Sequence, residues 1–141
     1  MDADPLFDDE YRLTSSSPAI DAGHNWRVPQ DDFDLDHDDD LEELLPIDLA
    51  DMPRFADVGD VPDTGCGSAV LVDMGACEAP GDAVAAMKLG DIDGNGSVGF
   101  TDLLTLLDEH GPCSPGCCSA DLNLDGVVGF SDLLLLLDRW G

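Results

Sequence analysis

The sequence predicts a mixed fold in two parts: an all-α C-terminal part and an N-terminal part of short strands and loops. The C-terminal prediction rests on an internal repeat, because residues 91–111 and 121–141 are identical at 12 of 21 aligned positions and both continue into a Leu-rich run with helical spacing. Residues 1–79 instead contain short apolar pieces between turn-forming residues. The composition agrees with two small units, since 15 Gly, 9 Pro and 6% aromatic residues do not describe one large core.

The boundary between the two parts is predicted at the Ala-Pro-Gly-Asp stretch 79–82. We therefore expect a first domain over residues 1–79, a linker over 80–89 and a second domain over 90–141. The stretch 83–89 fits either a plain linker or a weak helical turn.

Each repeat should form one short amphipathic helix. The expected apolar stripes are Phe100, Leu103, Leu104 and Leu107 in the first repeat, and Phe130, Leu133, Leu134 and Leu137 in the second. Two short helices of this kind bury their apolar faces against each other. Gly111 and Gly141 are placed where the helices should have ended.

Each repeat opens with oxygen-bearing side chains at alternate positions and a glycine at position 6. Such a tight loop turns alternate side chains toward one hard cation, and a carboxylate from the following helix closes the shell. Oxygen ligands without Cys or His favour calcium over zinc or copper, and the octahedral geometry of magnesium suits the loop less well. We therefore expect two Ca²⁺ ions. The expected ligands are Asp91, Asp93, Asn95, Ser97 and Asp102 in the first loop, and Asp121, Asn123, Asp125, Val127 and Asp132 in the second, with Ser97 and Val127 supplying backbone carbonyls.

The charge of the chain excludes several classes of partner. The sequence has 32 acidic residues against 5 Lys and Arg, and a formal net charge of −27 at pH 7. Such a chain repels nucleic acid and anionic membranes, so its expected partners are divalent cations or a basic protein surface. No stretch approaches the roughly 18 apolar residues of a membrane span, and the first residues lack the pattern of a signal peptide.

The cysteines indicate an oxidising compartment. Five cysteines, a pI near 4.1 and many calcium-type ligands suit the extracellular space or the cell surface, and we expect the chain to be the C-terminal piece of a longer secreted protein. Cys113 is expected to pair with Cys117 or Cys118, and Cys66 with Cys77, which leaves one thiol over. A zinc site at these cysteines is disfavoured, because neighbouring Cys117 and Cys118 do not easily reach one tetrahedral ion.

The second loop has no room for the entering helix of an ordinary EF-hand, because the Pro- and Gly-rich stretch 111–118 precedes it. Two such loop–helix units in tandem, each with the pattern D-x-[DN]-x-[DN]-G-x-V-G-F-[ST]-D-L-L, resemble the dockerin domain over residues 90–141. The resemblance implies calcium-dependent docking of an extracellular protein onto a cohesin-like domain, often on a polysaccharide-degrading enzyme. Dockerins typically read the partner at positions 10 and 11, here Phe100–Thr101 and Phe130–Ser131. We expect both Phe side chains to turn into the core and therefore expect weak cohesin binding.

The N-terminal part resembles the last turns of secreted right-handed parallel β-helix proteins. The resemblance is carried by residues 3–24, ADPLFDDEYRLTSSSPAIDAGH, and residues 72–78, VDMGACE, with a long acidic insertion between them. This family includes polysaccharide lyases, hydrolases and adhesins, so an alternative function is the tail of a polysaccharide-degrading enzyme. The catalytic grooves of that family lie on central coils, which residues 3–79 do not include. We assign no catalytic residue and expect no enzymatic activity from this chain.

The acidic run 34–40 within that insertion is a weaker candidate for a further calcium site. Counted from Asp34, it lacks a glycine at the sixth position and has Leu45 at the twelfth. The expected structure is therefore a solvated acidic loop.

Overall fold

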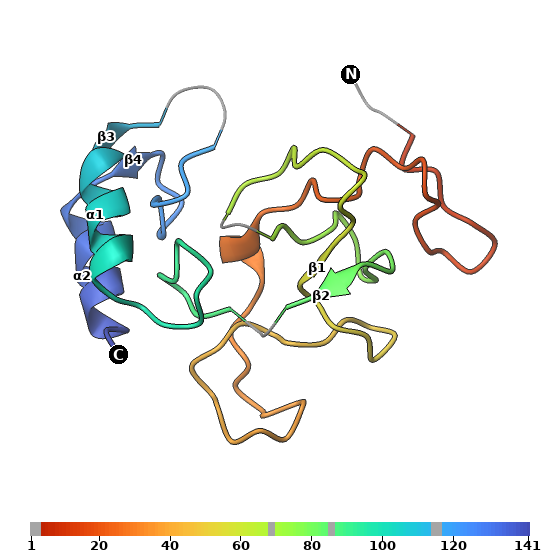
Figure 1. Cartoon of the computed structure of the whole chain (residues 1–141), viewed down its shortest axis with the longest axis horizontal. Coiled ribbons are helices and arrows are strands. Elements are labelled where there is room, and N and C mark those ends of the chain that lie inside the picture. Colours follow the sequence, from red (N-terminus) through yellow and green to blue (C-terminus); the bar gives the residue numbers. More distant parts are fainter. Residues whose placement is uncertain (1–3, 68–69, 85–86, 114–116) are drawn as a thin grey trace.

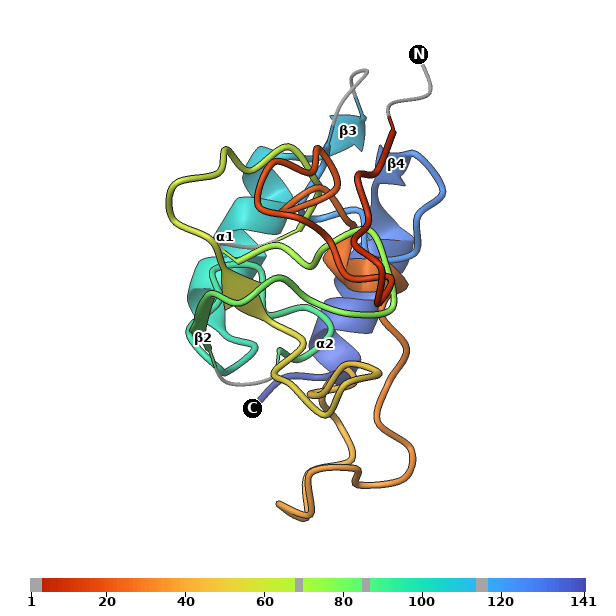
Figure 2. The same ribbon diagram turned by 90° about the vertical axis from the view of Figure 1, so that its right-hand side faces the viewer.

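The computed structural model describes residues 4–67, 70–84, 87–113 and 117–141, and most of this backbone runs as irregular loops (Figure 1). Its elements are η1 (Asn25–Arg27), β1 (Ala56–Asp57), β2 (Asp82–Ala83), α1 (Phe100–Asp108), β3 (Gly111–Pro112), β4 (Val127–Val128) and α2 (Phe130–Asp138). The helices α1 and α2 contact each other at one end of the molecule, and the N-terminal segment forms the other end (Figures 1 and 2).

The predicted fold class is wrong. The repeats are not all-α, because β3 and β4 pair as an antiparallel sheet with Gly111 opposite Val128. β1 pairs antiparallel with β2, which lies in the stretch predicted as a linker. Within the described N-terminal residues, parallel pairing is limited to one bridge between His24 and Cys66. The physical reason is the density of Asp in this segment, whose side chains bind nearby backbone N–H groups and so replace sheet ladders.

The loop–helix arrangement of the repeats agrees with the sequence. Both helices have nine residues and begin directly after a glycine, Gly99 or Gly129. Asp102 and Asp132, in the first turns, accept a hydrogen bond from the backbone N–H of that glycine at 2.8 Å. A carboxylate in this position also interacts favourably with the positive end of the helix dipole. No helix lies directly before either loop within the described residues.

Most of the predicted apolar stripe of each helix is exposed, and only Leu103 and Leu133 of its members pack against the core. Leu106 and Leu136 are buried, with 1% and 0% of their surface exposed, whereas Phe100 and Phe130 are 67% and 72% exposed. The expectation that both Phe side chains turn into the core is therefore wrong. The reason is geometric: Asp102 faces the loop, and Leu106 lies four residues later on the same side of the helix.

The hydrophobic core runs through both parts of the chain. Trp26 donates a hydrogen bond from Nε1 to the carbonyl oxygen of Ser119 at 2.7 Å, so the N-terminal segment is fastened to the repeats. The stretch predicted as a linker also packs, because Met87 is buried and its carbonyl accepts the N–H of Leu44. The core members are Trp26, Val28, Leu44, Phe55, Val72, Met87, Ile92, Val98, Leu106, Ala120, Leu122, Val128 and Leu136. The division into two domains stays a prediction, and the two parts share this core.

Candidate metal centre

The first loop, residues 91–102, gathers three of its predicted ligands. Carboxylate oxygens of Asp91, Asp93 and Asp102 lie within 4.8 Å of one another. Asp102 accepts hydrogen bonds from the backbone of Ile92 and Asp93 through Oδ1 at 2.7 and 3.0 Å. Asp91 accepts from the backbone N–H of Asn95 at 3.1 Å. The loop backbone thus holds the carboxylates in place around a common space.

The second loop, residues 121–132, repeats these contacts. Asp132 accepts from the backbone of Leu122 and Asn123 at 2.9 and 3.1 Å, and Asp121 accepts from Asp125 at 3.2 Å. Its three carboxylates do not meet within 4.8 Å among the described groups. Here the amide of Asn123 donates to Oδ2 of Asp125 at 3.0 Å. The two loops therefore share a backbone framework but differ in how their side chains are turned.

The glycine at position 6 has the backbone conformation that the sequence predicted for the turn. Gly96 and Gly126 both have a φ of +89°, a value that residues with a Cβ rarely adopt. Each donates its N–H to Oδ2 of the first Asp of its loop, at 2.8 Å in the first loop and 2.9 Å in the second. The sharp turn thus brings the backbone onto the first carboxylate.

The predicted ligands divide into buried and exposed groups. Asp91, Asp102, Asp121 and Asp132 are buried, and Asp93 is half-buried. The remaining predicted ligands are exposed: Asn95, Ser97, Asn123, Asp125 and Val127. In each loop the carboxylates at positions 1 and 12 are therefore buried, whereas most of the other predicted ligands are exposed to solvent.

The electrostatics of the first loop favour a cation. Burial raises the pKa of Asp91, and the nearby carboxylates of Asp102 and Asp93 add to this effect, while hydrogen bonds from Gly96 and Asn95 oppose it. The ion pairs of the described residues involve no carboxylate of either loop. A divalent cation would relieve this like-charge repulsion.

Two disulfides are present, between Cys66 and Cys117 and between Cys113 and Cys118. The second is one of the two pairings predicted for Cys113. The predicted pairing of Cys66 with Cys77 is wrong, and Cys77 is free. Cys66 pairs with the repeats because the shared core brings residues far apart in sequence together. The disulfides are consistent with an extracellular protein.

Two further acidic groups were missed as sites in the sequence. Carboxylate oxygens of Asp21, Asp57 and Asp63 lie within 4.8 Å of one another, and the same holds for Asp31, Asp36 and Glu43. No spacing rule connects the members of the first group. In the second, Asp36 belongs to the acidic run 34–40 that the sequence offered as a weaker candidate, whereas Asp31 and Glu43 lie outside that run.

Burial has marked electrostatic effects in both of these groups. Burial, followed by the charges of Asp73, Asp57 and Asp63, raises the pKa of Asp21 to about 6. The backbone N–H of Val58 slightly lowers the pKa of Asp21 but forms no hydrogen bond with either of its carboxylate oxygens. For the second group, burial raises the pKa of Glu43 to about 7, with contributions from surrounding aspartates.

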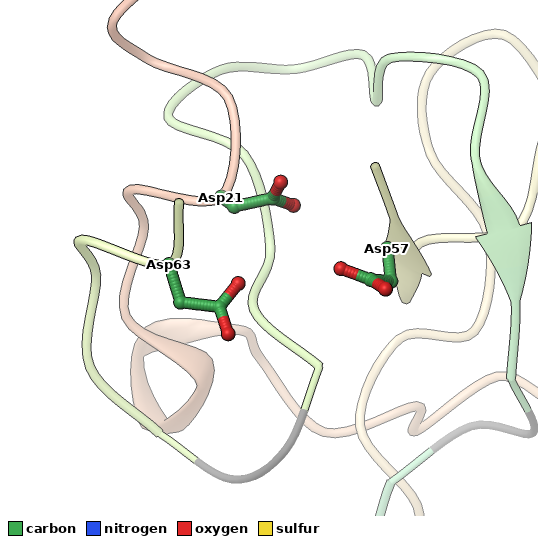
Figure 3. Close-up of side chains that lie close together, drawn as sticks. All are labelled: Asp21, Asp57 and Asp63. Atoms are coloured by element: carbon green, nitrogen blue, oxygen red, sulfur yellow. The ribbon is translucent and has the colours of Figure 1, made fainter. Parts of the chain in front are cut away.

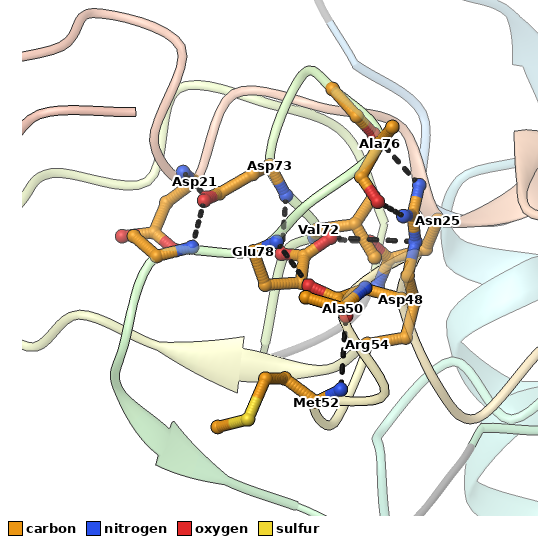
Figure 4. Close-up of polar contacts among 12 residues, drawn as sticks. Asp21, Asn25, Asp48, Ala50, Met52, Arg54, Val72, Asp73, Ala76 and Glu78 are labelled. Atoms are coloured by element: carbon orange, nitrogen blue, oxygen red, sulfur yellow. Dashed lines mark hydrogen bonds and ion pairs between the residues drawn. The ribbon is translucent and has the colours of Figure 1, made fainter. Parts of the chain in front are cut away.

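Other buried carboxylates have a structural role, as the polar network of Figure 4 shows. Asp73 accepts the N–H groups of Asp21 and Ala79, at 2.8 and 2.6 Å. Glu78 accepts the N–H of Asp73 at 2.9 Å and faces Nε of Arg54 at 3.3 Å. Burial raises the pKa of Glu78 to about 8. Asp73 is thus held by backbone donors, and Glu78 by one backbone donor and the ion pair with Arg54.

Comparison with models of known families, with curated proteins and with solved structures finds no match. Within the described residues, neither helix has the length and apolar character needed to cross a membrane. The function is therefore argued from the site alone.

Proposed function

We propose that residues 90–141 bind two calcium ions, one in each repeat loop, and act as a dockerin-like module that attaches an extracellular protein to a partner. The observation that carries the proposal is the shared framework of the loops. In each loop the same five backbone N–H groups, at positions 2, 3, 5, 6 and 9, bind the carboxylates at positions 1 and 12. The repeated geometry supports a repeated ligand.

Calcium would also stabilise the helices. Isolated helices of nine residues are too short to be stable in water, and each loop brings three carboxylates into a small space. An ion that binds only the folded loop adds its binding free energy to folding. Calcium binding and folding of the repeats are therefore coupled.

The calcium proposal is tested by counting ions on the intact chain with native mass spectrometry. Asp93→Ala and Asp125→Ala should each lower the count of bound Ca²⁺ by one, because each removes an accessible ligand from one loop. Asp108→Ala, which removes an exposed carboxylate at the end of α1, is the matched control and should leave the count unchanged. Chelator should reduce the helical circular dichroism signal. Unchanged counts in both loop variants, with helicity insensitive to chelator, would contradict the proposal.

The docking face is the exposed side of the two helices, defined by Phe100, Leu104, Leu107, Phe130, Leu134 and Leu137. Apolar groups gathered on one surface commonly mark a protein interface, and aromatic residues often anchor it. The hydroxyl residues Thr101 and Ser131 are exposed beside the Phe residues, and Asp108 and Asp138 are exposed at the helix ends. This chemistry fits a cohesin-like domain with an apolar patch and basic side chains around it.

Partner binding is tested with a panel of cohesin domains in biolayer interferometry, with calcium and with chelator. We expect a calcium-dependent complex that Leu104→Lys together with Leu134→Lys abolishes, because both positions are half-exposed on the docking face. Leu49→Lys, at an 80% exposed leucine of the N-terminal segment, is the control and should bind normally. Absence of binding to any cohesin domain, or binding unaffected by the double variant, would refute this docking face.

A further inference from the structure

The carboxylate of Asp21 is an unusual group in this structure. Asp21 has 0% of its surface exposed, and neither of its carboxylate oxygens has a hydrogen-bond partner. A buried carboxylate without a donor or a counter-charge is strongly unfavourable. Something that is not part of the chain is expected to satisfy these two oxygens.

The side chains of Asp57 and Asp63 point toward the same space as Asp21 (Figure 3). Oxygens of the three carboxylates lie within 4.8 Å of one another. Asp57 belongs to β1 and is half-buried, and Asp63 lies in the following loop and is exposed. Three carboxylates so close together repel one another unless a cation lies between them.

The backbone holds this arrangement firmly. The carbonyl of Asp21 accepts the N–H groups of Thr64 and Gly65 at 2.9 and 3.0 Å, which fixes the loop that carries Asp63. Asp57 is paired with Asp82 in the β1–β2 sheet. Beside this pair, a Cβ on Gly81 would lie 2.3 Å from the Asp57 carbonyl oxygen, so the close approach requires glycine.

We propose that Asp21, Asp57 and Asp63 form a third calcium site, separate from the two repeat loops. Three hard oxygen ligands without Cys or His select calcium or magnesium rather than zinc or copper. The exposed side near Asp63 leaves room for the several waters that complete the large coordination shell of calcium. The site joins two stretches of the N-terminal segment that are distant in sequence, around Asp21 and over residues 57–63, so calcium here acts as a cross-link.

The third site is tested with Asp63→Asn, because Asp63 is exposed and its replacement leaves the core intact. Native mass spectrometry of the full chain in calcium should show one Ca²⁺ fewer than the wild type. Asp60→Asn, at an exposed carboxylate in the same loop, should keep the wild-type count. The repeat variants Asp93→Ala and Asp125→Ala should lose their ions independently of Asp63. Equal counts for Asp63→Asn and Asp60→Asn would overturn the proposal.

A measurement on the wild type covers the case in which the variant does not fold. Crystals grown in calcium should show an anomalous difference peak between the three carboxylates. Absence of that peak, while the repeat loops are occupied, overturns the third site without affecting the proposed function. Magnesium occupying the site at equal concentrations of the two ions would overturn the calcium assignment.

A different unpartnered group carries a second proposal in the acidic loop, residues 31–43. Glu43 is 5% exposed, and its Oε1 is buried without a hydrogen-bond partner. The loop is closed at its base by the N–H of Asp31, which donates to the carbonyl of Glu43 at 2.9 Å. Asp31 is itself buried and accepts the N–H of Leu35 at 2.7 Å.

The carboxylates of the acidic loop converge on this group. Oxygens of Asp31, Asp36 and Glu43 lie within 4.8 Å of one another, and Asp36 belongs to a second such group with Asp34 and Asp38. The nearby Lys88 pairs with Asp40 at 3.0 Å. The two ends of the acidic loop are buried together, and most residues between them are exposed. We infer that the acidic loop holds a fourth calcium ion, with Glu43 as the innermost ligand.

The fourth site is tested with Asp36→Asn, which removes an exposed member shared by both carboxylate groups. The bound Ca²⁺ count should fall by one relative to the wild type. Asp39→Asn is the matched control, since Asp39 is exposed in the same loop, belongs to neither group, and its φ of +71° is one that Asn tolerates. The same count in both variants, or no anomalous peak beside Glu43 in wild-type crystals grown in calcium, would overturn the fourth site.

Discussion

At the scale of single residues, the acidic side chains fall into two kinds that composition does not distinguish. Asp48 and Asp73 are buried, and their oxygens accept backbone N–H groups. Asp21 and Glu43 are equally buried but have oxygens without any partner. Counting donors for each oxygen therefore singles out Asp21 and Glu43 as carboxylates with oxygens that no described protein donor reaches.

Replacing the position-6 glycine should weaken a loop through its backbone alone. Gly126 has a φ of +89°, and a Cβ there would meet nothing within 4 Å. Gly126→Ala should therefore destabilise the protein by about 1 kcal/mol and lower calcium affinity in the second loop. Gly129→Ala is the control, because Gly129 has an extended φ of −147°. Chemical denaturation in calcium measures both, and equal effects would contradict the backbone argument.

Glu78 should make stability depend on pH. Burial raises the pKa of Glu78 to about 8, above its ordinary value of 4.5. Between these two pH values the folded chain keeps a proton on Glu78 that the unfolded chain releases. The contribution of Glu78 to the free energy of unfolding is therefore fully present below about pH 4.5 and is lost as pH rises to about 8. We expect the free energy of unfolding to fall over this window.

The measurement is urea unfolding at several pH values in saturating calcium. The slope contributed by one proton is at most about 1.4 kcal/mol per pH unit. Glu78→Gln should remove that slope, because the amide does not titrate and still offers an oxygen to the N–H of Asp73. A wild-type slope that persists in Glu78→Gln would assign the effect to another group.

At the scale of elements, one ligand position determines which side of each helix is buried. Asp102 and Asp132 turn inward to bind the loop backbone, and each has 0% of its surface exposed. Leu106 and Leu136, one turn later, are buried on that side. The leucines on the opposite side are consequently left on the surface. The carboxylate that binds the loop and the buried leucine therefore lie on the same side of each helix.

Neighbouring leucines of α1 should respond differently to truncation. Leu106→Ala removes a side chain that is 1% exposed and should cost about 2–5 kcal/mol of stability, because it leaves a cavity between the helices. Leu107→Ala, at a side chain 53% exposed, should cost well under 1 kcal/mol. Thermal unfolding in calcium distinguishes the two. Similar losses would show that α1 is rotated relative to this structure.

At the scale of the whole molecule, the N-terminal segment and the repeats form one packed unit. Trp26 inserts into the shared core and bonds to Ser119, and Arg139 of the repeats donates to Oε1 of Gln30 at 2.9 Å. The Cys66–Cys117 disulfide joins the same two parts. Calcium sites in either part would therefore stabilise the other through the core.

Removing that disulfide should weaken the whole protein. Cys66→Ser together with Cys117→Ser opens a covalent link between positions 51 residues apart. Unfolding of the wild type and the double variant in calcium should differ by about 2–4 kcal/mol. Cys77→Ser is the control, since Cys77 is free, and should behave like the wild type. A double variant as stable as the control would show that the core alone holds the two parts together.

The sequence by itself determined the local features of this protein. Spacing predicted the two loop–helix units, the glycines at position 6 and the inward-facing carboxylates of the first loop, because such loops are stabilised by contacts within about a dozen residues. The tertiary structure decided what depends on distant contacts. The partner of Cys66 and the meeting of Asp21 with Asp57 and Asp63 follow from packing across the shared core. Five cysteines offer several pairings and an acidic chain offers many possible carboxylate groupings, so only the folded backbone selects among them.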